Sequence, residues 1–135
     1  MKGMTRVTTQ EIKVVAVEDV PADRRRGGDL RTLLSPKTSG STSGFMGVGT
    51  IAAGDYISEH YHPYSEMFLY VVSGSLVARL DGVRHELPAR HGVMVPPNVK
   101  YRLMNEGDGE TFIVWHAGPL APRPELGHVD TETHE

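Results

Sequence analysis

The chain contains no cysteine, and this absence excludes several kinds of chemistry. Disulfide bonds, thiolate metal ligands and a cysteine nucleophile are all ruled out. Any function must therefore be carried by other side chains.

The chain also lacks a long apolar run and an excess of positive charge. No run is long enough to span a membrane, and the N-terminal residues 1–6 lack the apolar region of a signal peptide. The 14 basic and 17 acidic residues give a formal net charge of -3, and no basic stripe with interleaved aromatic residues is present. We therefore expect a cytoplasmic protein that binds neither a membrane nor nucleic acid.

What the chain does have is a series of short apolar runs separated by turn signals. This pattern is typical of an all-β sandwich or barrel, and 135 residues suit a single domain. Asp81-Gly82, between two strand-like runs, is a strong hairpin signal. We predict strands over residues 12–17, 30–34, 45–53, 67–72, 76–80, 83–87, 93–95, 99–104 and 111–117. We assign residues 1–11 to a flexible N-terminus, residues 12–118 to the barrel domain and residues 119–135 to a loosely ordered C-terminal tail.

One segment concentrates residues of the types that bind metals. His60 and His62 are one residue apart, and Glu66 follows four residues later. On a strand, positions i and i+2 point to the same face, so both imidazoles can converge on one ion, and Glu66 can face back from the next strand. Imidazole and carboxylate suit zinc, iron, manganese, nickel or copper. An isolated His-x-His pair is as often a solvated strand edge, but the full pattern Gly-x5-His-x-His-x3-Glu-x7-Gly, from Gly54 to Gly74, favours a metal site.

This pattern resembles the first motif of the cupin family, Gly-x5-His-x-His-x3,4-Glu-x6-Gly, with one extra residue before the last glycine. The second cupin motif, Gly-x5-Pro-x-Gly-x2-His-x3-Asn, is matched in part. Pro96 and Asn105 are in place, whereas Arg90 and Asn98 stand at the two glycine positions. Tyr101 replaces the histidine that usually provides the fourth metal ligand. The resemblance implies an all-β, single-domain fold, the cupin-type jelly-roll β-barrel or double-stranded β-helix.

The replacement at Tyr101 leaves the fourth ligand position open. A tyrosine phenol, with a pKa near ~10, is a poor zinc ligand unless it is ionised. Because His116 shares one face of the last predicted strand with Phe112 and Val114, it can project into the barrel as a substitute ligand. A hydrogen-bonded histidine at a strand end is an equal alternative. Tyr101 then either packs in the barrel or donates a hydrogen bond above the metal.

The predicted site therefore has His60, His62, Glu66 and His116 as metal ligands. Glu66, His116 and Tyr101 are its candidate catalytic residues, and whether Glu66 is a ligand or a base stays open. The expected cofactor is one divalent transition metal per chain, zinc first, with iron, nickel or manganese as alternatives.

Beyond these motifs, the chain resembles the small single-domain cupins of bacterial aromatic polyketide pathways, the cyclases of the tetracenomycin and resistomycin type. The resemblance is carried by residues 58–66, residues 68–74 and residues 115–124. It implies a metal-dependent aromatic polyketide cyclase that promotes regioselective, aldol-type ring closure of a poly-β-ketone in antibiotic biosynthesis. Two alternatives stay open: a cupin oxygenase with a non-haem metal, such as a quinone-forming anthrone oxidase, and a non-catalytic cupin that binds a small molecule.

The same resemblance implies partners. The substrate is an aromatic polyketide intermediate, which an acyl carrier protein can carry. The acidic surface of a carrier protein could bind the cluster Arg24-Arg25-Arg26, although such a cluster is more often a solvated loop. Small cupins usually pair, so the resemblance also implies a homodimer.

Overall fold

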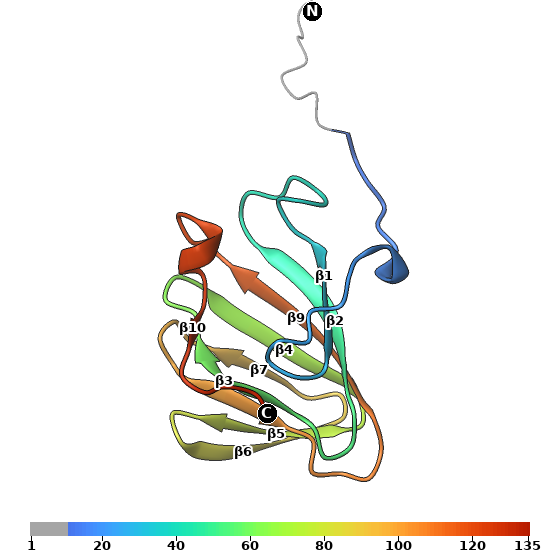
Figure 1. Cartoon of the computed structure of the whole chain (residues 1–135), viewed down its shortest axis with the longest axis vertical. Helices are drawn as coiled ribbons and strands as arrows, with labels where there is room; N and C mark the ends of the chain where they lie inside the picture. The colour runs from blue at the N-terminus through green and yellow to red at the C-terminus, as the bar shows by residue number, and fades with distance from the viewer. Residues whose placement is uncertain (1–10) are drawn as a thin grey trace, which may run out of the picture.

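The computed structural model describes residues 11–135, and most of its regular structure is β-strand (Figure 1). The predicted flexible N-terminus, residues 1–11, lies outside the described residues except for Glu11. The strands are β1 (Asp29–Leu34), β2 (Phe45–Ile51), β3 (Tyr56–Tyr61), β4 (Glu66–Ser73), β5 (Ser75–Leu80), β6 (Val83–Pro88), β7 (Gly92–Val95), β8 (Tyr101–Met104), β9 (Thr111–Gly118) and β10 (Val129–Asp130). Two short 3₁₀ helices, η1 (Val17–Asp19) and η2 (Pro124–Leu126), lie near the ends of the described chain.

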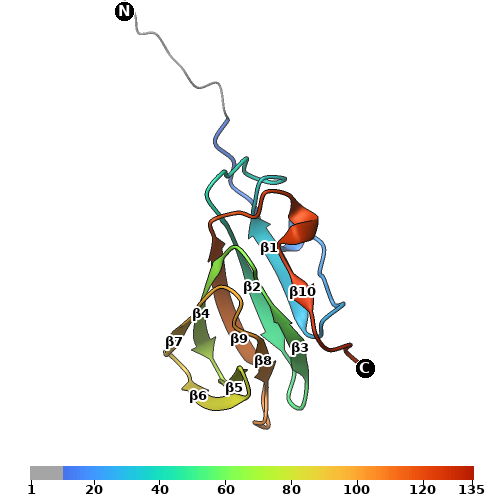
Figure 2. The same cartoon turned by 90° about the vertical axis from the view of Figure 1, so that its left-hand side faces the viewer.

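The strands form two five-stranded sheets, in the orders β1-β2-β9-β4-β7 and β10-β3-β8-β5-β6. Neighbouring strands pair antiparallel. In the first sheet, β4 and β9 pair along nearly their whole lengths. Figures 1 and 2 show the two sheets as the walls of a flattened barrel. The all-β jelly-roll fold and the single domain predicted from the sequence are confirmed.

The core lies between the sheets, where inward-facing side chains of both meet. In β4 the buried Met67, Leu69 and Val71 alternate with Phe68 and Tyr70, which are each 44% exposed. This alternation is the period of two that a strand with one buried face requires. Burying each large apolar side chain contributes roughly 1.5–3 kcal/mol, so the alternation fixes which face of each strand is turned inward.

The turns use left-handed backbone where the sequence indicated it. Asp81 and Gly82, with φ of 47° and 83°, form the predicted hairpin between β5 and β6. Arg90 and Asn98 occupy the two positions where the second motif has glycine, and they take φ of 69° and 70°. The backbone keeps the conformation that glycine would adopt freely. Asparagine tolerates this conformation, whereas arginine adopts it less readily.

The first predicted strand is absent. Residues 11–16 have no assigned secondary structure, and the side chains of Ile12 and Val14 are almost fully exposed. Their alternation has the period of a strand, but a strand also needs a neighbour, and none pairs with this segment among the described residues. The prediction of a strand over residues 12–17 is wrong.

The C-terminal segment, predicted as a loosely ordered tail, instead packs along β3. Val129 and Asp130 pair with Tyr61 and His60 as the short strand β10. Further on, the Glu132 carboxylate accepts hydrogen bonds from the Glu59 amide at 2.8 Å and from Arg102 Nε at 3.0 Å. Polar contacts and ion pairs hold this segment. The apolar pattern of the sequence therefore could not predict that this segment packs against the barrel.

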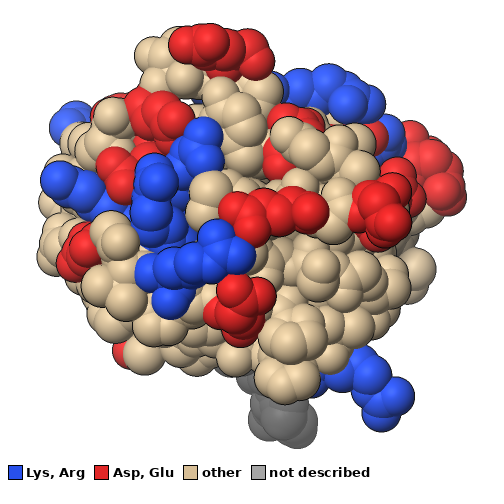
Figure 3. Space-filling view, turned by 90° about the horizontal axis from the view of Figure 1, so that it is seen from below, with Lys and Arg blue, Asp and Glu red and all other residues tan. Residues whose placement is uncertain are grey.

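The surface carries both signs of charge in close proximity. On the face shown in Figure 3, basic and acidic side chains lie next to one another. Elsewhere among the described residues, side chains of opposite charge form ion pairs, such as Arg84 with Glu106 at 2.8 Å. No helix in the described part of the chain is long and apolar enough to cross a membrane.

Candidate functional site

A cavity of about 540 Å³ opens between the two sheets, near the end where the C-terminal segment lies. Apolar and polar side chains both line it. The apolar part of the wall includes Leu30, Phe45, Ile57, Met67, Leu69, Leu103, Ile113 and Trp115. One group of polar residues consists of Arg26, His60, His62, Tyr101 and His128, and the lining also includes Asp23, Arg25, Thr32, Ser35, Lys37 and Thr38. This combination suits a ligand that is mainly apolar but carries oxygen atoms along one side.

Strand β3 positions the two histidines of the first motif. His60 lies within β3 and His62 follows just after it, and both side chains are buried. The His60 ring is fixed by a hydrogen bond between Nδ1 and the Ser58 carbonyl, at 2.8 Å. Because a carbonyl only accepts, Nδ1 carries the proton and Nε2 is left with its lone pair. The two imidazole rings lie 5.5 Å apart, centroid to centroid, and both line the cavity.

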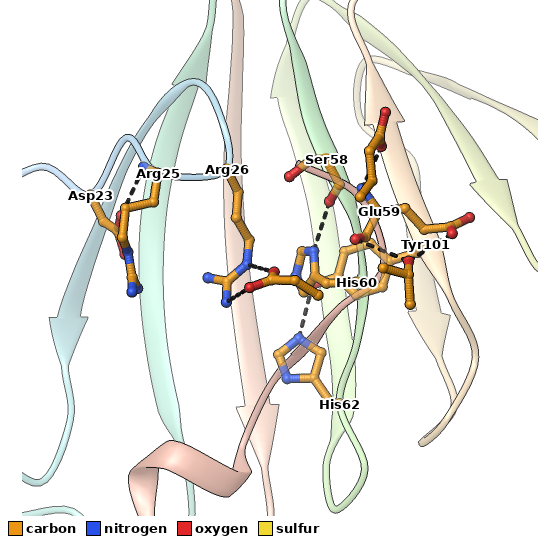
Figure 4. Close-up of polar contacts among 11 residues, drawn as sticks. Asp23, Arg25, Arg26, Ser58, Glu59, His60, His62 and Tyr101 are labelled. Carbon is orange, nitrogen blue, oxygen red and sulfur yellow. Dashed lines mark hydrogen bonds and ion pairs between the residues drawn. The ribbon is translucent and has the colours of Figure 1, made fainter. Parts of the chain in front are cut away.

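Tyr101, at the start of β8, completes this group. Its hydroxyl lies 2.9 Å from Nε2 of His62, and its ring is 4.5 Å from that of His60, centroid to centroid. Complete burial raises the pKa of the Tyr101 hydroxyl well above its ordinary value. The phenol is therefore neutral at physiological pH and keeps a proton that it can donate. Figure 4 shows the three side chains together.

His128, from the C-terminal segment, is the third histidine of the cavity. Its ring centroid lies 4.4 Å from that of His62 and 5.8 Å from that of His60. No local pattern points to this residue, because it lies in a polar stretch without periodicity. Only the pairing of β10 with β3 brings it to the site.

Arg26 is a cation of the cavity that acts on all three of its histidines. Arg26 lies in the loop before β1, and its side chain is shown in Figure 4. Its Nε lies 2.6 Å from a carboxylate oxygen of Asp130 on β10. Two glycines follow Arg26, and Gly27 has so little room that an added Cβ would lie 2.0 Å from the Tyr56 carbonyl. This close approach turns the loop toward β3. The Gly27-Gly28 pair was the available sequence signal that Arg26 differs from its two neighbours.

Burial keeps the histidines neutral. The pKa of His60 is lowered to about 4, mainly by loss of water and with a contribution from the Arg26 cation. Burial likewise lowers the pKa of His62 to about 3 and that of His128 to about 4, again with a contribution from Arg26. At pH 7 the site therefore contains three neutral imidazoles, which accept protons, beside a neutral phenol, which donates one.

Glu66 and His116 do not join this group. Both side chains are exposed, Glu66 on β4 and His116 on β9. The inward position next to Glu66 is held by Met67, which is 3% exposed. The extra residue before Gly74 explains this, because one residue of offset moves a side chain to the other face of a strand. The expectations that Glu66 faces the histidines and that His116 projects into the barrel are wrong.

These positions decide how well the site suits a metal. Among residues 11–135, no group of three or more histidine, aspartate or glutamate side chains is arranged to hold an ion. The predicted ligands are divided between the inside and the outside of the barrel, Tyr101 occupies the hydrogen-bonding position at His62, and the Arg26 cation lies close by. The side chains of the cavity therefore do not fit the metal site of the first motif. Their arrangement suits proton transfer.

The comparisons with known proteins agree with the fold. The cupin domain family matches residues 47–117, so the chain belongs to the cupin family. Protein SchB of Streptomyces halstedii is 56% identical over 126 residues, which cover 93% of this chain and 91% of SchB. The tetracenomycin polyketide synthase protein TcmJ of Streptomyces glaucescens is 43% identical over 118 residues, or 87% of this chain and 79% of TcmJ.

A solved structure shares the architecture at low sequence identity. The polyketide cyclase RemF of Streptomyces resistomycificus superposes with a TM-score of 0.71 and 18% identity, covering 93% of this chain and 89% of RemF. The family model begins at β2 and stops within β9, so Arg26 and His128 both lie outside the residues that it matches.

Proposed function

We propose that this cupin acts in aromatic polyketide biosynthesis as a cyclase that directs the ring closure of a poly-β-ketone intermediate. The observation that carries the proposal is the cavity of about 540 Å³, in which three histidines and Tyr101 lie beside a wall of apolar and aromatic side chains. Two comparisons support it, the likeness to a tetracenomycin polyketide synthase protein and the shared architecture with a polyketide cyclase.

The chemistry needs a proton donor at a carbonyl oxygen and a proton acceptor at an adjacent carbon. The methylene groups between the ketones of a poly-β-ketone are already acidic, so modest general acid–base catalysis is enough. When the proton of His62 is on Nε2, this nitrogen donates to the Tyr101 oxygen, and the phenol proton is free to bind a substrate oxygen. A neutral imidazole at the same end of the cavity accepts the carbon-bound proton.

The apolar wall contributes orientation. A flexible chain of ketones can close several different rings, and holding it in one shape selects one of them. Phe45 and Trp115 lie on the wall of the cavity and offer flat surfaces against which a forming aromatic ring can pack. Exclusion of water by this wall also strengthens the hydrogen bonds to the substrate oxygens.

We infer that the chain's own side chains suffice for this reaction. The family resemblance implied a metal-dependent enzyme, but the donor groups that would complete a metal site are on the outside of β4 and β9. A cyclase that works through Tyr101 and the histidines keeps its activity after removal of metals. Stoichiometric iron with oxygen consumption would instead favour the oxygenase alternative.

Two partners follow from this proposal. Arg24 and Arg25 are exposed, and Arg25 also lines the cavity, so they can meet the acidic surface of an acyl carrier protein that delivers the substrate. The second partner is another copy of the chain. An apolar groove of about 440 Å³ on the outer face of the first sheet, lined by Phe68, Tyr70 and Met94 among others, is the surface we propose for the homodimer.

Reconstitution tests the proposed function. The chain is added to a minimal polyketide synthase that releases a poly-β-ketone, and the ring pattern of the products is determined by liquid chromatography and mass spectrometry. We expect the chain to shift the products toward one ring pattern. An unchanged pattern, with a correctly folded chain, contradicts the proposal.

Binding offers a second measurement. The chain has a single tryptophan, Trp115, and it lines the cavity. Its fluorescence should therefore be quenched by a flat polyphenol such as 1,8-dihydroxyanthraquinone. A Phe45→Glu variant, which places a charge on the same wall, should weaken this binding at least tenfold.

A further inference from the structure

The C-terminal segment is anchored to the barrel on both sides of His128. Before it lies η2, and after it β10 pairs with β3, so that Asp130 stands opposite His60. The Thr131 amide donates to the Glu59 carbonyl at 3.0 Å, and the Arg26–Asp130 ion pair ties the segment to the loop before β1. The segment therefore holds the His128 ring in the cavity rather than over it.

His128 differs from the two other histidines in its hydrogen bonds. His60 is hydrogen-bonded through Nδ1 to the Ser58 carbonyl, and His62 is hydrogen-bonded through Nε2 to the Tyr101 hydroxyl. His128 is held by ring contacts instead, with Phe45 at 6.2 Å as well as with the two histidines. Within residues 11–135 no hydrogen bond to either of its ring nitrogens is found. Both nitrogens are thus available to a molecule in the cavity.

The neighbouring His62 has a less available second nitrogen. Its Nδ1 is fully buried and has no hydrogen-bond partner among the described residues. The backbone of Gly127 nevertheless lies close enough to favour the protonated ring. His62 is therefore suited to support Tyr101, whereas His128, which is only partly buried and lines the cavity, is suited to touch the substrate.

We propose that His128 is the general base of the site, and that the C-terminal segment exists to place it opposite the Tyr101–His62 pair. This inference rests on the proposed function. A neutral imidazole nitrogen of His128 takes a proton from a methylene carbon between two ketones, and the electron pair of that C–H bond remains as an enolate.

The enolate carbon then attacks a second carbonyl carbon. A carbon–carbon bond forms, the carbonyl π bond breaks, and its electron pair goes to the oxygen, which takes the proton of the Tyr101 hydroxyl. The proton held by His128 returns through the cavity to the tyrosinate. Atoms and charge balance without any oxidant, reductant or co-reactant.

Asp130 and Arg26 are positioning residues in this scheme. The Asp130 carboxylate lies close enough to favour a charged His128, while Arg26 opposes it. Their mutual ion pair limits both effects and fixes the segment across the cavity mouth. Removing either partner should therefore displace His128 and alter the proton transfer without removing the ring itself.

The test compares His128→Gln and His128→Ala with Val129→Ala as a matched control. Val129 lies on β10 beside His128 and does not line the cavity, so its substitution perturbs the segment while the ring stays. Each variant is checked for folding by circular dichroism and for binding of 1,8-dihydroxyanthraquinone by Trp115 fluorescence. The rate of directed ring closure is then measured in the reconstituted synthase.

We expect both His128 variants to lose at least 100-fold in the rate of directed product, with binding of the anthraquinone changed less than threefold. Val129→Ala should stay within threefold of the parent. Added imidazole should restore the His128→Ala variant at least tenfold, because the cavity left by the ring can admit a free base. A merely structural residue would show no such rescue.

Two results would overturn the assignment of His128. One is a directed rate within threefold of the parent in His128→Gln. The other is a loss of rate that imidazole does not restore and that parallels a loss of binding. The proposed function fails separately, when the parent chain leaves the ring pattern of the synthase unchanged.

Discussion

At the scale of single residues, the chemistry of the site follows from burial. Tyr101 keeps its proton and the three histidines of the cavity are neutral at pH 7, because burial removes most of the water around their rings. The sequence predicted His60, His62 and Tyr101 correctly as neighbours, since a period of two and the spacing of the second motif fix their positions. It could not predict His128 or the inward turn of Arg26, because both depend on contacts between segments far apart in the chain, β10 with β3 and Arg26 with Asp130, which local patterns do not encode.

Tyr101→Phe removes one oxygen and keeps the packing of the ring. We expect the rate of directed ring closure to fall roughly 100-fold, because the proton donor to the substrate oxygen is lost. The free energy of unfolding should fall by about 1–3 kcal/mol, since His62 Nε2 loses its buried partner. Steady-state kinetics and urea denaturation measure the two effects. A variant as fast as the parent would remove Tyr101 from the mechanism.

The stability of the chain should depend on pH between about 7 and 4.5. The folded-state pKa values of His60, His62 and His128 lie near 4, 3 and 4, below the ordinary 6.5, so the unfolded chain binds more protons in this range. The stabilisation is therefore complete above pH 6.5 and is lost as the pH falls, by about 2 kcal/mol per histidine at pH 5. Urea denaturation at several pH values measures it.

The control for this effect is His128→Gln, which removes one titrating group. Its unfolding free energy should fall less steeply with decreasing pH than that of the parent. An equal slope in the two proteins would show that His128 is not buried in its neutral form.

At the scale of elements, one residue of offset in β4 explains why Glu66 is not inside the barrel. By residue type the motif predicts Glu66 as its carboxylate, but Gly74 fixes the end of the strand and leaves Met67 at the inward position. The strands themselves were predictable, because the apolar alternation and the Asp81-Gly82 turn are local. The predicted strand over residues 12–17 is absent, because apolar alternation alone does not make a strand when no neighbouring strand pairs with the segment.

Glu66→Ala and His116→Ala test this reassignment. Both side chains are exposed on the outer face of the first sheet, so we expect directed ring closure within twofold of the parent. By contrast, Met67→Ala removes buried volume beside the cavity and should cost about 2–5 kcal/mol in unfolding free energy. A large loss of activity in Glu66→Ala, with unchanged stability, would show that this carboxylate takes part in the reaction and would contradict the reassignment.

At the scale of the whole molecule, the barrel has an inner and an outer apolar surface with different uses. The inner surface forms the cavity, and the outer surface of β4, β7 and β9 exposes Phe68, Tyr70 and Met94, each more than 40% accessible. Alternation with the buried Met67 and Leu69 of β4 places Phe68 and Tyr70 on the outer face. Met94, on β7, is exposed next to the buried Val95.

Phe68→Glu tests whether a second copy covers the outer surface. We expect the parent chain to sediment as a dimer and the variant as a monomer, because a charge on each copy would be buried without a partner. His85→Glu, an exposed position on β6 of the other sheet, serves as the control and should remain dimeric. Analytical ultracentrifugation distinguishes the species, and a monomeric parent would contradict the prediction.

The central claim is that the side chains of the cavity direct ring closure by proton transfer. The most direct measurement is the ring pattern produced by a minimal polyketide synthase with the chain after exhaustive chelation, with metal content determined per chain. We predict that the directed pattern persists with less than about 0.1 metal ion per chain. Loss of the pattern on chelation, and its return on addition of zinc or iron, would contradict the account.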